Sequence, residues 1–177
     1  MCKAAGMTLM ELLTGLAIVA VLATLAAPSF QTLHWNSRRT TAVNGFLHTL
    51  FLARSEAIKR GQVVSVCHSR DGQRCDSGFD WSDGWIVFAN RDRDEPPVRD
   101  AAEEVIVAAV GWRGVSITSN RRAYSFRPMA QAVVNGTIVF CDARGSAHAR
   151  AIIISHTGRP RVAQLDADGK PLRCPSG

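Results

Sequence analysis

The residues of this sequence that could do chemistry include two arginines in the segment Gly158-Arg159-Pro160-Arg161. In an extended segment, side chains two positions apart point to the same side, about 7 Å from each other, which is close to the spacing of successive phosphates in a nucleic acid. Pro160 cannot donate to a sheet ladder, so an edge strand or a loop is expected. The pair is a candidate phosphate-binding site; an ordinary solvated turn is the alternative.

The charge distribution favours phosphate binding. The formal net charge is +6, and the acids are concentrated between Asp71 and Glu104. Such asymmetry leaves a basic C-terminal end, which is a cue for nucleic-acid binding. No interleaved aromatic series predicts stacking on single strands, so we expect double-stranded DNA, bound through its backbone with slight sequence preference. The basic residues around the arginine pair are Arg144, His148, Arg150, His156, Lys170 and Arg173.

Four cysteines follow the N-terminal apolar segment: Cys67, Cys75, Cys141 and Cys174. In an oxidising compartment disulfides are the default, and four cysteines allow three connectivities. We favour Cys67 with Cys75, which would close a loop containing the turn signal Asp71-Gly72, and Cys141 with Cys174, which would tie the tail to a strand. A zinc site is the competing interpretation, but no Cys-x-x-Cys or histidine spacing supports it.

Motifs of catalysis are missing from the sequence. It contains no Gly-x-Ser-x-Gly, phosphate loop or metalloprotease helix, and no convincing pair of acid and base. We therefore expect neither an enzyme nor a cofactor.

The first element that must position these residues is an almost unbroken apolar run over residues 12–27. At about 1.5 Å per residue, such a helix spans the ~30 Å hydrocarbon core of a bilayer. Glu11 stands at its edge, where a carboxylate is costly enough in lipid to be treated as functional. Lys3 and Gly6 precede the run, unlike the cleavage site of a secretory signal peptide, so we expect residues 7–29 to remain as a membrane-spanning helix.

Residues 30–61 are predicted to continue this helix, with a kink near Pro28 and an end at Gly61. Apolar residues recur at spacings of three and four, which predicts one face packed on a folded domain. This stripe consists of Val43, Phe46, Leu47, Leu50, Phe51, Ala57 and Ile58.

Residues 62–177 are predicted to form one β-rich globular domain. Short runs of branched and aromatic residues alternate with turn signals such as Asp83-Gly84. The fold class is therefore α+β: a long N-terminal helix, half membrane-spanning and half amphipathic, packed on an antiparallel β-sandwich or a bent β-sheet. The predicted strands are residues 62–68, 85–90, 105–110, 115–119, 123–127, 137–141, 150–155 and 161–165.

The segment Gly6-Met7-Thr8-Leu9-Met10-Glu11 resembles the prepilin peptidase site of type IV pilins and pseudopilins, and Pro28 falls at the helix-kinking proline of that family. The resemblance implies that residues 1–6 are a leader, that prepilin peptidase cleaves after Gly6, and that Met7, where the family usually has Phe, becomes the methylated terminus. It also implies that Glu11 pairs with the terminal amine of a neighbouring pilin in the filament. The implied location is the inner membrane, crossed once, with a periplasmic domain that is later assembled into a pilus at the cell surface.

The order of a long helix followed by β structure resembles the FimT and GspH branch of minor pilins and pseudopilins. Gly158-Arg159-Pro160-Arg161 is similar to the GRxR motif of FimT proteins that bind DNA during natural transformation. The resemblance implies contacts from Arg159 and Arg161, with Gly158 as a backbone requirement and neighbouring basic residues around them. The alternative is a structural GspH-like pseudopilin of a type II secretion system that does not bind DNA. The neighbouring basic residues in this hypothesis are Arg144, Arg150, Lys170 and Arg173.

Overall fold

The computed structural model describes residues 6, 8–129 and 134–175 of the chain, without the side chains of residues 25–28. Within these residues it contains the long helix α1 (Leu9–Arg60), the short 3-10 helix η1 (Ser146–His148) and eight β-strands. The chain divides into two compact units, Met1–Ser37 and Arg38–Gly177, which we describe one after the other.

In the first unit, α1 begins directly after Thr8. The Thr8 hydroxyl oxygen accepts a hydrogen bond from the backbone N–H of Glu11 at 3.3 Å, so Thr8 acts as the N-cap. Glu11 lies in the first turn, where a carboxylate favours the helix dipole, and it forms no ion pair with the described residues. This part of α1 is long and apolar enough to cross a membrane. Met7 and the side chain of Pro28 lie outside the described residues, so the processing site at Met7 and the kink remain predictions.

In the second unit, the rest of α1 buries one face on the domain. Gly61, with a φ of 63°, follows the last helical residue, as predicted. The predicted stripe is wrong at Phe51 and Ile58, whose side chains are 50% and 57% exposed. Each lies about 100° further round the helix than the buried residue before it, which takes it off the packed face. The buried residues of this face are Ala42, Val43, Phe46, Leu50, Ala53 and Ala57.

The strands form two four-stranded antiparallel sheets within the described residues. All eight lie within two residues of the predicted runs. The first sheet has the order β3-β2-β1-β5, with β1 (Val63–His68), β2 (Gly84–Asn90), β3 (Val105–Val110) and β5 (Ala123–Phe126). The second has the order β4-β6-β7-β8, with β4 (Ser116–Ser119), β6 (Gly136–Cys141), β7 (Arg150–Ile154) and β8 (Pro160–Ala163).

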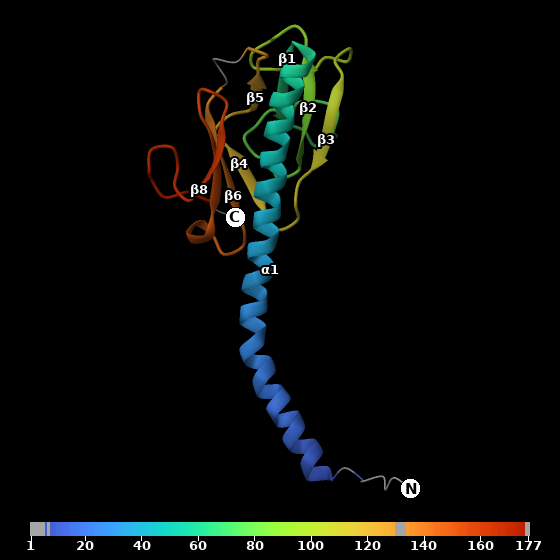
Figure 1. Cartoon of the computed structure of the whole chain (residues 1–177), viewed down its shortest axis with the longest axis vertical. Coiled ribbons are helices and arrows are strands. Elements are labelled where there is room, and N and C mark those ends of the chain that lie inside the picture. The colour runs from blue at the N-terminus through green and yellow to red at the C-terminus, as the bar shows by residue number, and fades with distance from the viewer. Residues whose placement is uncertain (1–5, 7, 130–133, 176–177) are drawn as a thin grey trace. The chain divides into compact units, whose positions relative to one another are not determined.

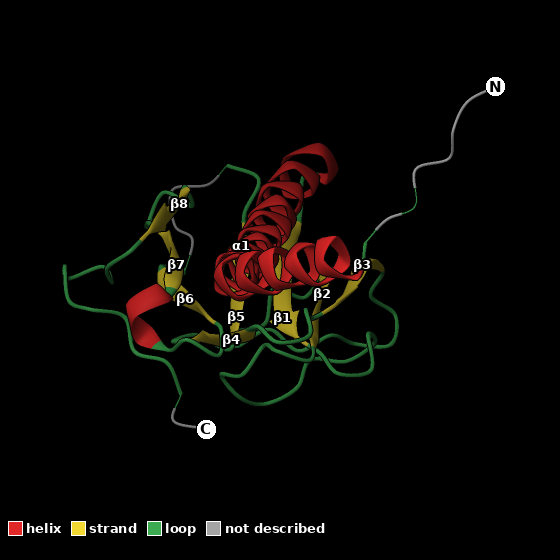
Figure 2. Ribbon diagram, turned by 90° about the horizontal axis from the view of Figure 1, so that it is seen from below, coloured by secondary structure: helices red, strands yellow, loops and turns green. Residues whose placement is uncertain are grey.

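The two sheets follow one another as a single bent layer on the helix, from β3 at one end to β8 at the other (Figure 1; Figure 2). A bridge between Asp80 and Thr118 adds a contact at β4, where the second sheet begins. The predicted α+β fold, a long helix packed on antiparallel β structure, is confirmed.

The core lies between α1 and the inner faces of both sheets. The ring centroid of Phe46 is 4.7 Å from that of Trp85 in β2 and 5.9 Å from that of Phe140 in β6. Aromatic side chains bury the largest apolar areas, so this cluster is a main source of the packing free energy. Because Phe46 contacts both sheets, it fixes α1 against the strands that carry the candidate site.

Candidate nucleic-acid interface

The segment Gly158–Arg161 belongs to the hairpin that joins β7 to β8. Ser155 accepts a hydrogen bond from the N–H of Gly158 at 2.8 Å, and its own N–H donates to the carbonyl of Arg159 at 3.2 Å. Gly158 has a φ of 73°, a left-handed conformation that favours glycine. The Arg54 guanidinium of α1 donates to the Thr157 carbonyl at 2.8 Å and holds this turn on the helix. This conformation agrees with the predicted backbone role of Gly158, which stays a prediction.

The register of β7 and β8 sets the face on which Arg161 lies. Arg161 is paired with Ile153, whereas Val162 is paired with Ile152 of the main core. Directly opposite residues share a face and successive residues alternate, so Arg161 lies on the outer face of the second sheet, away from α1. Arg159 precedes β8 and lies in the turn, where its carbonyl accepts the N–H of Ser155. The same-side arrangement of the two arginines therefore stays a prediction.

Both arginines are accessible. Their side chains are exposed, and no carboxylate among the described residues forms an ion pair with either one. Strand β8 is the outer edge of its sheet, which agrees with the prediction from Pro160. Two guanidinium groups on a free edge can approach a polyanion without first breaking an internal contact.

Lys170 and Arg173 lie on the segment that returns along this outer face. Leu165 and Pro171 form a bridge, and Leu172 packs on the outer-face cluster of Cys141, Ala149 and Ala151. Lys170 and Arg173 are exposed and line a hollow of about 600 Å³ together with Val139. Asp166 also lines this hollow, with a carboxylate oxygen that accepts the backbone N–H groups of Asp168 and Lys170. We call Arg159, Arg161, Lys170 and Arg173 the outer basic surface.

Arg150 and Arg144 are placed elsewhere. Arg150 lies two and four residues before Ile152 and Ile154 of the main core, and residues at these spacings in a strand share one face. Arg150 therefore lies on the helix-facing side of the sheet, opposite the outer basic surface. The guanidinium of Arg144 makes two hydrogen bonds to the Asp142 carboxylate, at 2.6 and 3.0 Å, and its side chain is only 18% exposed. The sequence grouped these two arginines with Arg159 and Arg161, but the structure does not, so we leave them out of the proposed contact surface.

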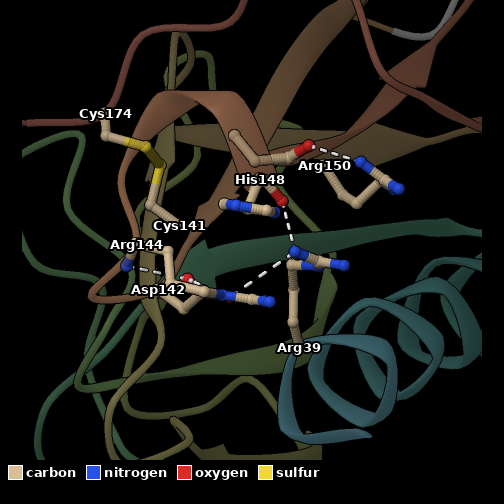
Figure 3. Close-up of polar contacts among 8 residues, drawn as sticks. Arg39, Cys141, Asp142, Arg144, His148, Arg150 and Cys174 are labelled. Atoms are coloured by element: carbon tan, nitrogen blue, oxygen red, sulfur yellow. Dashed lines mark hydrogen bonds and ion pairs between the residues drawn. A yellow bond between two sulfur atoms is a disulfide. The ribbon is translucent and has the colours of Figure 1, made fainter. Parts of the chain in front are cut away.

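Arg144 belongs to a buried charge cluster with Arg39 and Asp142, and the charge of Arg150 acts on Arg39 of this cluster (Figure 3). Arg39 of α1 donates to Asp142 at 3.5 Å and to the carbonyl of His148. Burial alone would raise the pKa of Asp142, but hydrogen bonds from Arg144 and the charge of Arg39 outweigh it, so this pKa lies below its usual range. The pKa of Arg39 is lowered, mainly by burial and secondly by the charge of Arg150. The negative charge of Asp142 partly offsets this lowering. The cluster ties α1 to the loop between β6 and β7.

Sequence reasoning missed Arg39. It lies three residues before Ala42 and four before Val43, so it continues the buried face of α1 and is 5% exposed. The signal for it in the sequence is an arginine at the helical spacing of the apolar stripe. Such an arginine is expected to be buried and therefore to require a carboxylate or carbonyl partner.

The disulfides stabilise the surroundings of the interface. Cys67 is bonded to Cys75 and Cys141 to Cys174, so both predicted pairings are confirmed. The second bond fixes the segment that carries Lys170 and Arg173, and the N–H of Cys174 also donates to the Ser146 hydroxyl at 3.0 Å. In the part of the chain that is described, no group of three His, Cys, Asp or Glu residues could hold a metal ion.

Comparisons with known proteins agree with this architecture. The family model described as "Type II transport protein GspH" matches residues 42–158, more than half of the chain. The crystal structure of the type IV minor pilin FimU from Pseudomonas aeruginosa PAO1 in space group P21 superposes with a TM-score of 0.57 at 18% identity, covering 78% of this chain and 96% of FimU. A second FimU crystal form, P65, gives 0.53 at 17% identity, covering 76% and 98%.

The minor pseudopilin EpsH of the type 2 secretion system of Vibrio cholerae gives a TM-score of 0.48 at 12% identity, covering 71% of this chain and 96% of EpsH. No curated protein sequence matches this chain.

Proposed function

The chain belongs to the GspH family, and from this premise we propose that it is a minor pilin that binds double-stranded DNA through its outer basic surface. In this proposal the N-terminal part of α1 anchors the protein in the inner membrane and then in a pilus. The β-rich domain presents Arg159 and Arg161 to incoming DNA, which supports its uptake in natural transformation.

The observation that carries the DNA-binding proposal is the position of Arg159 and Arg161. They are exposed, lie at the free edge of the second sheet, and have no carboxylate partner among the described residues. In an extended segment two such side chains lie about 7 Å apart, a spacing that suits successive phosphates of one strand. Lys170 and Arg173 on the same face extend the positive surface, whereas Asp166 limits it at the hollow.

The double substitution Arg159→Ala with Arg161→Ala tests this role. We expect affinity for duplex DNA to fall by about tenfold or more, because two phosphate contacts are lost while each removed side chain is exposed and forms no ion pair with the described residues. Fluorescence anisotropy of labelled duplex DNA, titrated with the detergent-solubilised chain, measures the affinity.

The matched control is Arg70→Ala with Arg74→Ala. It removes the same two charges from the exposed loop after β1, where Arg70 is paired with Asp83 and Arg74 with Asp71. The control should retain nearly all of the DNA affinity. Equal affinities of the unsubstituted chain and the Arg159/Arg161 variant would remove the DNA role.

The N-terminal residues have proposed roles in processing and assembly. Prepilin peptidase would cleave after Gly6 and expose Met7, and Glu11 would pair with the terminal amine of a neighbouring pilin. The exposed first-turn position of Glu11, without a basic partner among the described residues, supports this assignment. A charged carboxylate in an apolar helix requires such a counter-charge.

The second candidate is a structural pseudopilin of a type II secretion system that does not bind DNA. The description of the matching family, a type II transport protein, favours it. A deletion strain separates the two functions: loss of DNA uptake with intact protein secretion supports the first, and loss of secretion with intact DNA uptake supports the second.

A further inference from the structure

The two outer edges of the bent layer have different protection. Strand β8 carries Pro160 and Arg161, whereas β3 has the sequence Val-Ile-Val-Ala-Ala-Val without charge or proline. Native proteins protect free edges with charges, prolines or covering segments, because unpaired N–H and C=O groups can pair with another strand. Edge β8 has such protection in its own sequence, whereas the protection of β3 is confined to an irregularity of its register at Ile106, which leaves residues 107–110 regular.

No other described segment covers β3 by pairing. It forms a ladder with β2 on one side, and none of Val105–Val110 makes a backbone hydrogen bond to another described segment on the other side. Ala108 is exposed and Val110 is 83% exposed. Figure 1 and Figure 2 both show β3 at the end of the layer. The edge is therefore available for one more strand.

We propose that β3 pairs antiparallel with β3 of a second copy of this chain, which would join the first sheets of the two copies into one. The symmetric register is centred on Ala108, so that Ala108 of one copy lies opposite Ala108 of the other. It places Val107 opposite Ala109, so that apolar side chains meet across the centre of the new pair. Cross-strand pairs of this kind stabilise a sheet, and the backbone supplies the hydrogen bonds.

The charges that flank β3 favour this partner. Glu104 precedes the strand, and its side chain remains 53% exposed although it is paired with Arg60 at 2.7 Å. Arg113 follows the strand, is exposed, and has no acidic partner among the described residues. Antiparallel pairing of two copies brings the Glu104 end of each strand to the Arg113 end of the other. A parallel arrangement would place like charges together, so antiparallel self-pairing is the complementary one.

A charge introduced at the centre of the edge tests the proposal. Ala108→Lys places two ammonium groups near each other across the symmetric register, and we expect self-association to weaken by about tenfold or more. Sedimentation equilibrium of the 177-residue chain in detergent measures it. An equimolar mixture of Ala108→Lys and Ala108→Glu should associate again, because opposite charges then meet. The control Val162→Lys, at the β8 edge, should leave association unchanged.

Three results would overturn the proposal: a monomeric unsubstituted chain at every soluble concentration, association that Ala108→Lys does not change, or an equal loss in Val162→Lys. Association through the membrane helix alone gives the second result. If Ala108→Lys does not fold, hydrogen exchange of the unsubstituted chain replaces it. Alternate amides of β3 must then become protected as concentration rises, and protection that is independent of concentration contradicts the pairing.

Discussion

Asp142 is a buried carboxylate that pairs with two arginines. Its side chain is fully buried, and it accepts hydrogen bonds from Arg39 of α1 and from Arg144 of its own loop. Buried charges are tolerated only when they are paired, and the removal of one partner leaves the other uncompensated. Asp142 therefore joins the helix to the second sheet, although it takes no part in the proposed DNA contact.

We predict that Asp142→Asn lowers the free energy of unfolding by about 3 kcal/mol, because Arg39 and Arg144 lose their counter-charge. Denaturant unfolding followed by circular dichroism measures this change. The exposed pair of Arg70 and Asp83 provides the comparison, and Asp83→Asn should change stability by less than about 1 kcal/mol. Similar losses of unfolding free energy in the two variants would show that the buried cluster stabilises the fold no more than an exposed ion pair does.

The difference in stability between the unsubstituted chain and Asp142→Asn should depend on pH. The pKa of Asp142 is lowered in the folded state, so its stabilisation is fully present above the ordinary aspartate pKa of about 4 and is lost as the pH falls through the lowered value. The stability difference between the unsubstituted chain and Asp142→Asn should be constant near neutral pH and shrink in acid. A difference that stays constant through strong acid would contradict the lowered pKa.

Among the secondary-structure elements, strands were predictable and their partners were not. Short runs of branched residues between turn signals locate β1 to β8, because this pattern is local. That Arg150 and Arg161 lie on opposite faces depends on the pairing of β6, β7 and β8, which the alternation within one strand does not specify. Phe51 and Ile58 show the same limit in α1, since the apolar spacing allowed a stripe wider than the face the domain covers.

The hairpin between β7 and β8 depends on Gly158. We predict that Gly158→Ala costs roughly 1–2 kcal/mol of stability, because a β-carbon disfavours the observed φ of 73°. DNA affinity should also fall, since the turn positions Arg159. Gly158→Asn should cost less, because asparagine tolerates this conformation. Thermal unfolding and DNA titration check both variants, and equal behaviour of Ala and Gly at this position would refute the turn requirement.

The two disulfides should differ in their contributions. They link residues 8 and 33 positions apart, and loop-closure entropy predicts that loss of Cys141–Cys174 costs about 1 kcal/mol more than loss of Cys67–Cys75. The Cys141→Ala, Cys174→Ala double variant should also bind DNA less tightly, because it releases the segment of Lys170 and Arg173. The corresponding variant of Cys67 and Cys75 is the control, and a reversed order of DNA affinities would contradict this placement.

In the proposed function, the whole molecule separates assembly from ligand contact. The apolar part of α1 and Glu11 would serve the filament, whereas Arg161 of the proposed DNA contact lies on the face of the second sheet turned away from α1. The charge cluster and the aromatic core hold the domain on the helix. The free edge β3 lies at the opposite end of the bent layer from β8, so the proposed self-pairing would leave the proposed DNA contact open.

The most direct test of DNA binding is the salt dependence of duplex affinity for the unsubstituted chain and for the Arg159→Ala, Arg161→Ala variant. Each neutralised phosphate contributes about 0.9 to the slope of log affinity against log salt. We predict that the variant binds more weakly at low salt and that its slope is smaller by about 2. Superimposable lines for the two proteins, or an equal change in the Arg70→Ala, Arg74→Ala control, would contradict the account.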